Sequence, residues 1–168
     1  TMVGVMQLVE QGKLGLMDPL EKYLPEFASM RYAVDFPIGK FPIAWPTEQS
    51  ELRQAKNKIY IHDLMSMTAG LSYDVAAKPI RELVEATGGQ ANTRQIVGAM
   101  AKMPLLCEPG PRYSYALGHD VLAAVIEVIT GKTFGQYMKE SVFEPLGITQ
   151  MFYQVPEGQQ GRMSAQYA

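Results

Sequence analysis

The residues best suited to chemistry lie between positions 111 and 120, which read PRYSYALGHD. Two tyrosines, a serine, a histidine and an aspartate fall close together there, directly after a Pro-Gly pair. A tyrosine phenol acts as a general base only if its pKa falls from about 10 toward neutrality, which requires roughly 4 kcal/mol of phenolate stabilisation. One lysine ammonium in a partly desolvated site supplies most of that energy. Tyr113 and Tyr115 are therefore candidates whose role depends on a partner.

No serine of the chain has the neighbours of an activated nucleophile. The Gly-x-Ser-x-Gly elbow is absent, because Ser72 in GLSYD lacks the second glycine. Ser-x-x-Lys, in which a lysine one helical turn after the serine takes the hydroxyl proton, is also absent. An internal serine nucleophile of either type is thus excluded.

The two His-Asp pairs do not predict a metal site. Adjacent residues on a helix point about 100° apart, so neither His62-Asp63 nor His119-Asp120 would bind one metal together. Asp63 is expected in a first helical turn, where a carboxylate complements the helix dipole. His119 remains a candidate for the mouth of a pocket. The single Cys107 excludes an internal disulfide, and we expect neither a metal nor a cofactor.

Composition and charge are those of an ordinary globular domain. The 168 residues are 47% hydrophobic with a formal net charge of -2, and both signs are mixed along the chain. No run of five basic residues exists, so a nucleic-acid partner is not expected. No apolar run approaches the ~20 residues of a bilayer span, and no signal peptide is visible. The compartment, whether cytoplasmic, periplasmic or extracellular, stays open.

Apolar periodicity and capping patterns predict a mainly helical chain. The first helix, over 1–12, starts without a cap, so we expect its beginning to be missing. Asp18-Pro19 predicts a short helix through Tyr23, stopped by Leu24-Pro25. Asn92 with Gln95, and Thr133 with Gln136, are capping-box patterns. The predicted later helices cover 61–70, 79–86, 93–103, 121–130 and 133–141.

The segment 26–58 is predicted to be a long irregular excursion. It carries three prolines and the only tryptophan, Trp45. Such a segment is either packed over a functional site or disordered, and the composition leaves both readings open. Strand-like composition occurs only at 58–61 and 151–155. Two short pieces do not make a sheet that stands alone, so one partial domain over 1–168 is expected.

Three ordered blocks resemble the serine beta-lactamase and penicillin-binding-protein-like superfamily, which includes class C beta-lactamases, DD-peptidases and family VIII carboxylesterases. The blocks lie between residues 6 and 153 and so span nearly the whole chain. The central block is PGPRYSYALGHDVLAAVIEVITGKTFGQYMKESVFEPLGITQMFY, and an earlier one is IYIHDLMSMTAGLSYD. The first, MQLVEQGKLGLMDPLEKYLPEF, resembles the segment that follows the family's Ser-x-x-Lys nucleophile.

The resemblance assigns roles to residues of the central block. Tyr115 matches the catalytic tyrosine, which in the family handles protons of the nucleophilic serine and the leaving group together with the Ser-x-x-Lys lysine. Tyr113 falls on an aromatic position that normally packs. We take Ser114, His119 and Trp45 as candidates for lining the substrate pocket.

Leu117 is a further pocket candidate and a departure from the family pattern. Beta-lactamases and peptidases usually carry Asn there, whose amide hydrogen-bonds the substrate amide, whereas leucine has no polar group. Tyr-Ala-Leu is instead similar to the Tyr-Ser-Leu of family VIII esterases. The resemblance therefore favours ester hydrolysis over beta-lactam hydrolysis.

The resemblance also implies a fold and what is missing from it. We expect the helical region of an α/β (α+β) beta-lactamase/transpeptidase-like fold whose antiparallel sheet is largely missing. The nucleophile should lie a few residues before Thr1, and the third family motif beyond Ala168. Helices at 1–12 and 117–131 should then expose apolar faces that missing terminal segments, a companion chain or self-association would cover.

The predicted function is that of part of a serine hydrolase that forms an acyl-enzyme and hydrolyses a small carboxylic ester. The chain alone is expected to be inactive, because the nucleophile is absent. A beta-lactamase or DD-peptidase acting on a beta-lactam or peptidoglycan-like substrate is the alternative within the enzyme class. A non-catalytic binding or regulatory protein of the same fold is the alternative outside it.

Overall fold

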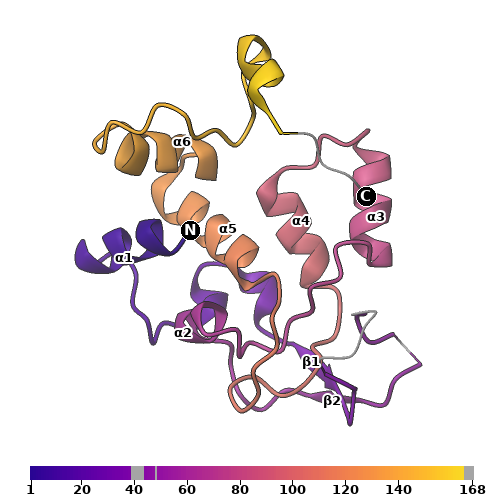
Figure 1. Ribbon diagram of the computed structural model, residues 1–168. Coiled ribbons are helices and arrows are strands. Elements are labelled where there is room, and N and C mark those ends of the chain that lie inside the picture. The colour runs from indigo at the N-terminus through magenta and orange to yellow at the C-terminus, as the bar shows by residue number, and fades with distance from the viewer. Residues whose placement is uncertain (39–43, 48, 165–168) are drawn as a thin grey trace.

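A computed structural model describes residues 1–38, 44–47 and 49–164 (Figure 1). Positions 39–43 and 48 of the predicted excursion lie outside the described residues. The α-helices are α1 (Met2–Glu10), α2 (Ile61–Met65), α3 (Lys78–Ala86), α4 (Thr93–Met100), α5 (Gly118–Thr130) and α6 (Phe134–Met138). The short helical turns are η1 (Leu20–Lys22), η2 (Pro25–Phe27), η3 (Lys139–Phe143) and η4 (Glu157–Arg162). The prediction of a mainly helical chain is confirmed.

Helix α5 is the centre of the hydrophobic core. Its stripe of Val121, Leu122, Val125 and Ile126 is completely buried, and each such side chain contributes about 1.5–3 kcal/mol relative to exposure. Helices α1, α2, α4 and α6 all contact it, as their positions around it in Figure 1 show. The helix ends where predicted, at Gly131 in the left-handed conformation with φ of 69°.

Helix α1 has the expected exposed apolar side chains, whereas α5 exposes Val128 but keeps its main apolar stripe covered. Other helices of this chain cover the α5 stripe: α1, α2 and α4, which precede it in sequence, and α6, which follows it. Helix α1 buries Val5 and Leu8 but leaves Val3 and Met6 about half exposed. Among the described helices, none has the length and apolarity needed to cross a membrane.

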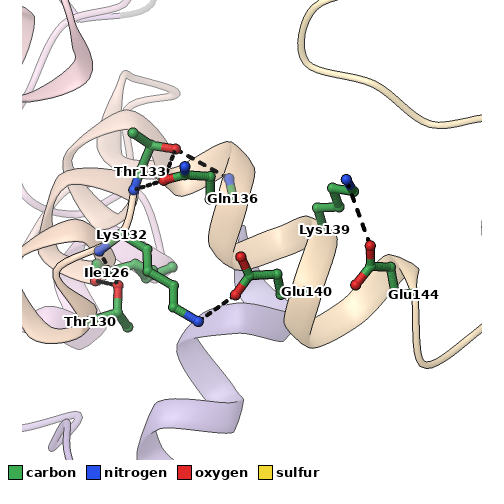
Figure 2. Close-up of polar contacts among 8 residues, drawn as sticks. All are labelled: Ile126, Thr130, Lys132, Thr133, Gln136, Lys139, Glu140 and Glu144. Carbon is green, nitrogen blue, oxygen red and sulfur yellow. Dashed lines mark hydrogen bonds and ion pairs between the residues drawn. The ribbon is translucent and has the colours of Figure 1, made fainter.

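Both predicted capping boxes are present. Asn92 accepts a hydrogen bond from the Gln95 amide N–H at 2.9 Å, and the Gln95 side chain accepts one from the Asn92 amide N–H at 2.9 Å. Thr133 and Gln136 form the same reciprocal pair at the start of α6, as Figure 2 shows. Helix α6 then continues as one π-helical turn, η3, so the helical segment extends slightly beyond the predicted end at 141.

Several predicted helices have different bounds in the structure. Asp18-Pro19 starts only the single 3-10 turn η1, because the Asp18 carboxylate bonds the Tyr23 hydroxyl and the Gly15 amide N–H instead of capping an α-helix. The helical turn stops before Leu24-Pro25, as predicted: Leu24 is non-helical with φ of -128°, and Pro25 begins a separate turn, η2. Helix α2 ends at Met65 rather than near position 70.

The strand predictions were wrong. The described residues form one antiparallel pair, β1 (Arg31–Ala33) with β2 (Leu52–Gln54), both inside the segment expected to be irregular. At 58–61 only the isolated bridge between Pro19 and Tyr60 forms, and 151–155 forms no strand. Both real strands have only three residues, too few to show an alternating pattern.

Candidate functional site

Tyr115 lies in the loop that leads into α5 and presents its phenol at the surface. The residue is 55% exposed. The ring packs against that of Tyr73, with the centroids 4.9 Å apart and the planes tilted by 49°. Tyr73 comes from the loop that follows α2, so two segments more than 40 positions apart in sequence meet at this aromatic pair.

Backbone hydrogen bonds hold the Tyr115 loop on the loop that follows α2. The amide N–H of Ser114 donates to the carbonyl of Met67 at 2.9 Å, and that of Leu117 donates to the carbonyl of Ser72 at 3.2 Å. Two earlier bonds continue the contact, from Leu106 N–H to Gly70 O at 2.7 Å and from Gly110 N–H to Thr68 O at 2.9 Å. Tyr115 is therefore fixed by bonds on both sides of it.

Two glycines allow these segments to approach closely. A Cβ atom on Gly118 would lie 2.7 Å from the carbonyl oxygen of Leu64, and one on Gly70 would lie 2.5 Å from that of Cys107. Gly70 also has φ of +76°, and Met67 takes φ of +60°, so the chain reverses sharply after α2. The position of Tyr115 thus depends on the α2–α5 contact.

The other predicted site residues lie in the same loop with different environments. Ser114 and Leu117 are buried, and Leu117 belongs to the hydrophobic core at the start of α5. His119 is half-buried in the first turn of α5. Tyr113 is 66% exposed, so the expectation that it packs is wrong in this structure. The loop turns its side chain outward while Ser114 takes the interior position.

Trp45 is brought to the same region by the excursion. It is buried, and its indole N–H donates to the carbonyl of Asp74 at 3.0 Å. The neighbouring carbonyl of Ala44 accepts a hydrogen bond from the Ser72 hydroxyl at 3.2 Å. At residues 44–47 the excursion therefore lies against the loop that carries Tyr73.

Sequence reasoning missed Tyr73 and Ser72 as members of this region. Both stand in GLSYD, at the end of a block whose resemblance was noted, and that position was the signal available. Nothing in the local pattern shows that the Tyr73 ring meets Tyr115, because the contact depends on how α2 and α5 pack.

Burial shifts the pKa of two titratable groups near the site. Asp120, in the first turn of α5, has its pKa raised by partial desolvation. Burial likewise raises the pKa of the Cys107 thiol, which makes it a poor nucleophile. Within the described part of the chain, no three His, Cys, Asp or Glu side chains lie close enough to hold a metal ion.

The arrangement can present a phenol to a hydroxyl or a leaving group brought to its exposed side. Such a phenol can pass a proton between the two, provided that a cation nearby stabilises the phenolate. A covalent step needs a nucleophile, and the sequence contains neither of the serine motifs considered above.

Comparison with known proteins gives a match over the whole length. The model of the Beta-lactamase family matches residues 1–168. Protein Rv1367c of Mycobacterium tuberculosis is 29% identical over 99% of this chain and 40% of its own length. Lovastatin esterase of Penicillium rubens is 29% identical over 92% of this chain and 37% of its own length. The chain thus spans about two fifths of these curated relatives.

A solved structure shows the same arrangement of elements. EstCE1, described as a hydrolase with promiscuous acyltransferase activity, superposes with a TM-score of 0.64 at 27% sequence identity. The match covers 93% of this chain and 37% of that one. The helices and the small sheet described above therefore form a partial beta-lactamase/transpeptidase-like fold.

Proposed function

Because the chain belongs to the beta-lactamase family, we propose that it is the tyrosine-bearing helical region of a serine hydrolase that cleaves carboxylic esters through an acyl-enzyme. Neither serine motif occurs in these 168 residues. The proposal therefore places the nucleophilic serine and its lysine in another part of a longer protein, which we call the full-length protein.

The observation that carries the proposal is the placement of Tyr115. Its phenol is exposed, while hydrogen bonds from Ser114 and Leu117 fix the backbone on either side of it. A group that transfers protons needs this combination of access and fixed position. Tyr115 is also the residue that matches the catalytic tyrosine of the family.

In the proposed reaction the serine oxygen attacks the ester carbonyl carbon, and its proton passes to the Tyr115 phenolate. The bond between the carbonyl carbon and the alcohol oxygen then breaks, and the phenol returns the proton to the departing alkoxide. Water repeats the attack on the acyl-serine and releases the acid. Tyr115 thus alternates between base and acid, and no proton is gained or lost over the cycle.

Leu117 supports an ester as the substrate. An amide or beta-lactam substrate carries polar groups that an Asn side chain at this position would bind, and leucine can neither donate nor accept a hydrogen bond. The burial of Leu117 in the core is consistent with a packing role at the start of α5. Lovastatin esterase, one of the relatives, is named for activity on an ester. A direct contact between Leu117 and substrate remains a prediction.

A comparison of two substrates tests the choice within the enzyme class. The full-length protein should hydrolyse a short-chain aryl ester much faster than a chromogenic cephalosporin. Equal or faster cephalosporin turnover would instead support the beta-lactamase alternative. Release of D-alanine from a D-alanyl-D-alanine peptide at a rate above that of the ester would support the peptidase alternative.

The rival outside the enzyme class is a binding or regulatory protein that retains the fold. The codons upstream of Thr1 discriminate between the two classes. A serine followed three positions later by lysine, just before this chain, supports the enzyme. Its absence from the full-length protein would favour the non-catalytic reading.

A further inference from the structure

Ser72 is a completely buried hydroxyl that the proposed chemistry does not use. It precedes Tyr73, whose ring packs on Tyr115, and its neighbours in sequence exclude it as a nucleophile. A buried hydroxyl is costly unless it is hydrogen-bonded, so its partners indicate what it stabilises.

The partners of Ser72 lie in three segments of the chain. Its hydroxyl donates to the carbonyl of Ala44 at 3.2 Å and accepts from the amide N–H of Asp74 at 3.2 Å. Its carbonyl accepts from the amide N–H of Leu117 at 3.2 Å, two residues after Tyr115. One residue therefore joins the excursion, the loop after α2 and the segment that enters α5.

Trp45 makes a second link between the same elements. Its indole N–H donates to the carbonyl of Asp74 at 3.0 Å, while the Asp74 amide is bonded to the Ser72 hydroxyl. The residues on both sides of Tyr73 are thus tied to the 44–47 segment, which leaves the Tyr73 ring free to lie against Tyr115.

We propose that Ser72 is a positioning residue for Tyr115: its hydroxyl ties the 44–47 segment to the loop on which Tyr115 is held. The proposal rests on the proposed function, since it assigns Ser72 to the support of the proton-transfer residue. Ser72 acts through Tyr73 and the Leu117 amide, and its buried hydroxyl makes no contact with substrate.

Hydrogen exchange on the full-length protein tests the anchoring without any chemistry. The Leu117 amide N–H reports how firmly the Tyr115 loop sits on Ser72, because that carbonyl is its acceptor. In Ser72→Ala we expect its exchange to accelerate about tenfold or more relative to the amides of Val125 and Ile126 in α5. Trp45→Phe, which removes the second link and keeps an apolar ring, should accelerate it in the same direction.

Thr130→Val is the matched control. It removes another hydroxyl, which donates to the Ile126 carbonyl at 2.7 Å at the far end of α5, and should leave the relative exchange of Leu117 unchanged. The contrary result is an exchange rate of the Leu117 amide that rises no more than the rates of the α5 amides in Ser72→Ala and Trp45→Phe. Such a result would reflect a general loss of stability and would overturn the proposal.

Kinetics of the full-length protein complete the test. Ser72→Ala should lower kcat for an aryl ester about tenfold and leave KM within about twofold, because misplacement of Tyr115 affects the transition state more than binding. Unchanged kcat would overturn the positioning role. The full-length protein could instead hydrolyse no ester while Ser72→Ala still accelerates exchange at Leu117 relative to the α5 amides. That combination would support the anchoring by Ser72 and contradict the proposed function.

Discussion

Gly118 and Leu64 meet so closely that a Cβ atom on Gly118 would lie 2.7 Å from the Leu64 carbonyl oxygen. This contact sets the distance between the start of α5 and α2, the two helices whose loops carry Tyr115 and Tyr73. Because the obstacle is backbone, the helices would have to separate to accept a side chain. The contact thus links the packing of the core to the geometry of the site.

Gly118→Ala should therefore destabilise the chain by about 2–4 kcal/mol, as overpacking against a rigid backbone does. Urea denaturation measures the change. Gly98→Ala, inside α4 where a Cβ atom meets nothing within 4 Å, is the control and should be neutral or stabilising by up to about 1 kcal/mol. Equal stability of the two variants would show that the α2–α5 approach is not tight.

Asp18 should make stability depend on pH in the acid range. Hydrogen bonds from Tyr23, Lys22 and the Gly15 amide lower the pKa of its carboxyl from 3.8 to about 2. A carboxyl whose pKa is lower when folded stabilises the chain fully above the unfolded pKa, and loses that contribution as pH falls through the folded pKa. The contribution is about 1–2 kcal/mol after allowance for solvent screening.

Asp18→Asn tests this dependence. Its free energy of unfolding should be lower than that of the native sequence by this amount at pH 6, and the difference should shrink between about pH 4 and pH 2. Denaturant titrations over that range give the comparison. A difference that stays constant with pH would mean that the hydrogen bonds of Asp18 do not favour its ionised form.

Thr133 should matter more to stability than the exposed ion pairs of the same region (Figure 2). Thr133→Ala removes the capping oxygen of α6 and should cost about 1 kcal/mol. Lys139 pairs with Glu144 at 3.7 Å with most of both side chains in solvent, so Lys139→Ala should cost less than about 0.5 kcal/mol. Thermal unfolding of both variants compares their losses of stability. A larger loss in Lys139→Ala than in Thr133→Ala would contradict this prediction.

The helices were largely predictable because their signals are local. Asn92 and Thr133 each stand three positions before a glutamine, and the structure contains both capping boxes. The α5 stripe and its stop at Gly131 follow from a 3.6-residue period and one conformationally free residue. Such patterns do not depend on the rest of the fold.

The strands and the support of Tyr115 were not predictable because their partners are distant in sequence. β1 pairs with β2 across about 20 residues, and each strand is too short to alternate. Tyr115 was singled out by resemblance, whereas its contact with Tyr73 requires the docking of α2 on α5. The burial of α5 by other helices of this chain likewise follows from tertiary packing.

Tyr115→Phe should leave the fold of the chain unchanged. Tyr115 is 55% exposed, and Phe retains the ring that packs on Tyr73. We expect the free energy of unfolding to change by less than about 0.5 kcal/mol, as for most surface substitutions. A loss above about 1 kcal/mol in urea denaturation would indicate that the hydroxyl has a structural partner.

The most direct test of the account is the rate of aryl ester hydrolysis by the full-length protein and its Tyr115→Phe variant. Tyr113→Phe, two residues away and 66% exposed, serves as the matched control. We predict that Tyr115→Phe lowers kcat/KM by about 10²–10⁴-fold while Tyr113→Phe keeps it within about twofold. Retention of the native rate by Tyr115→Phe would contradict the assignment of proton transfer to this tyrosine.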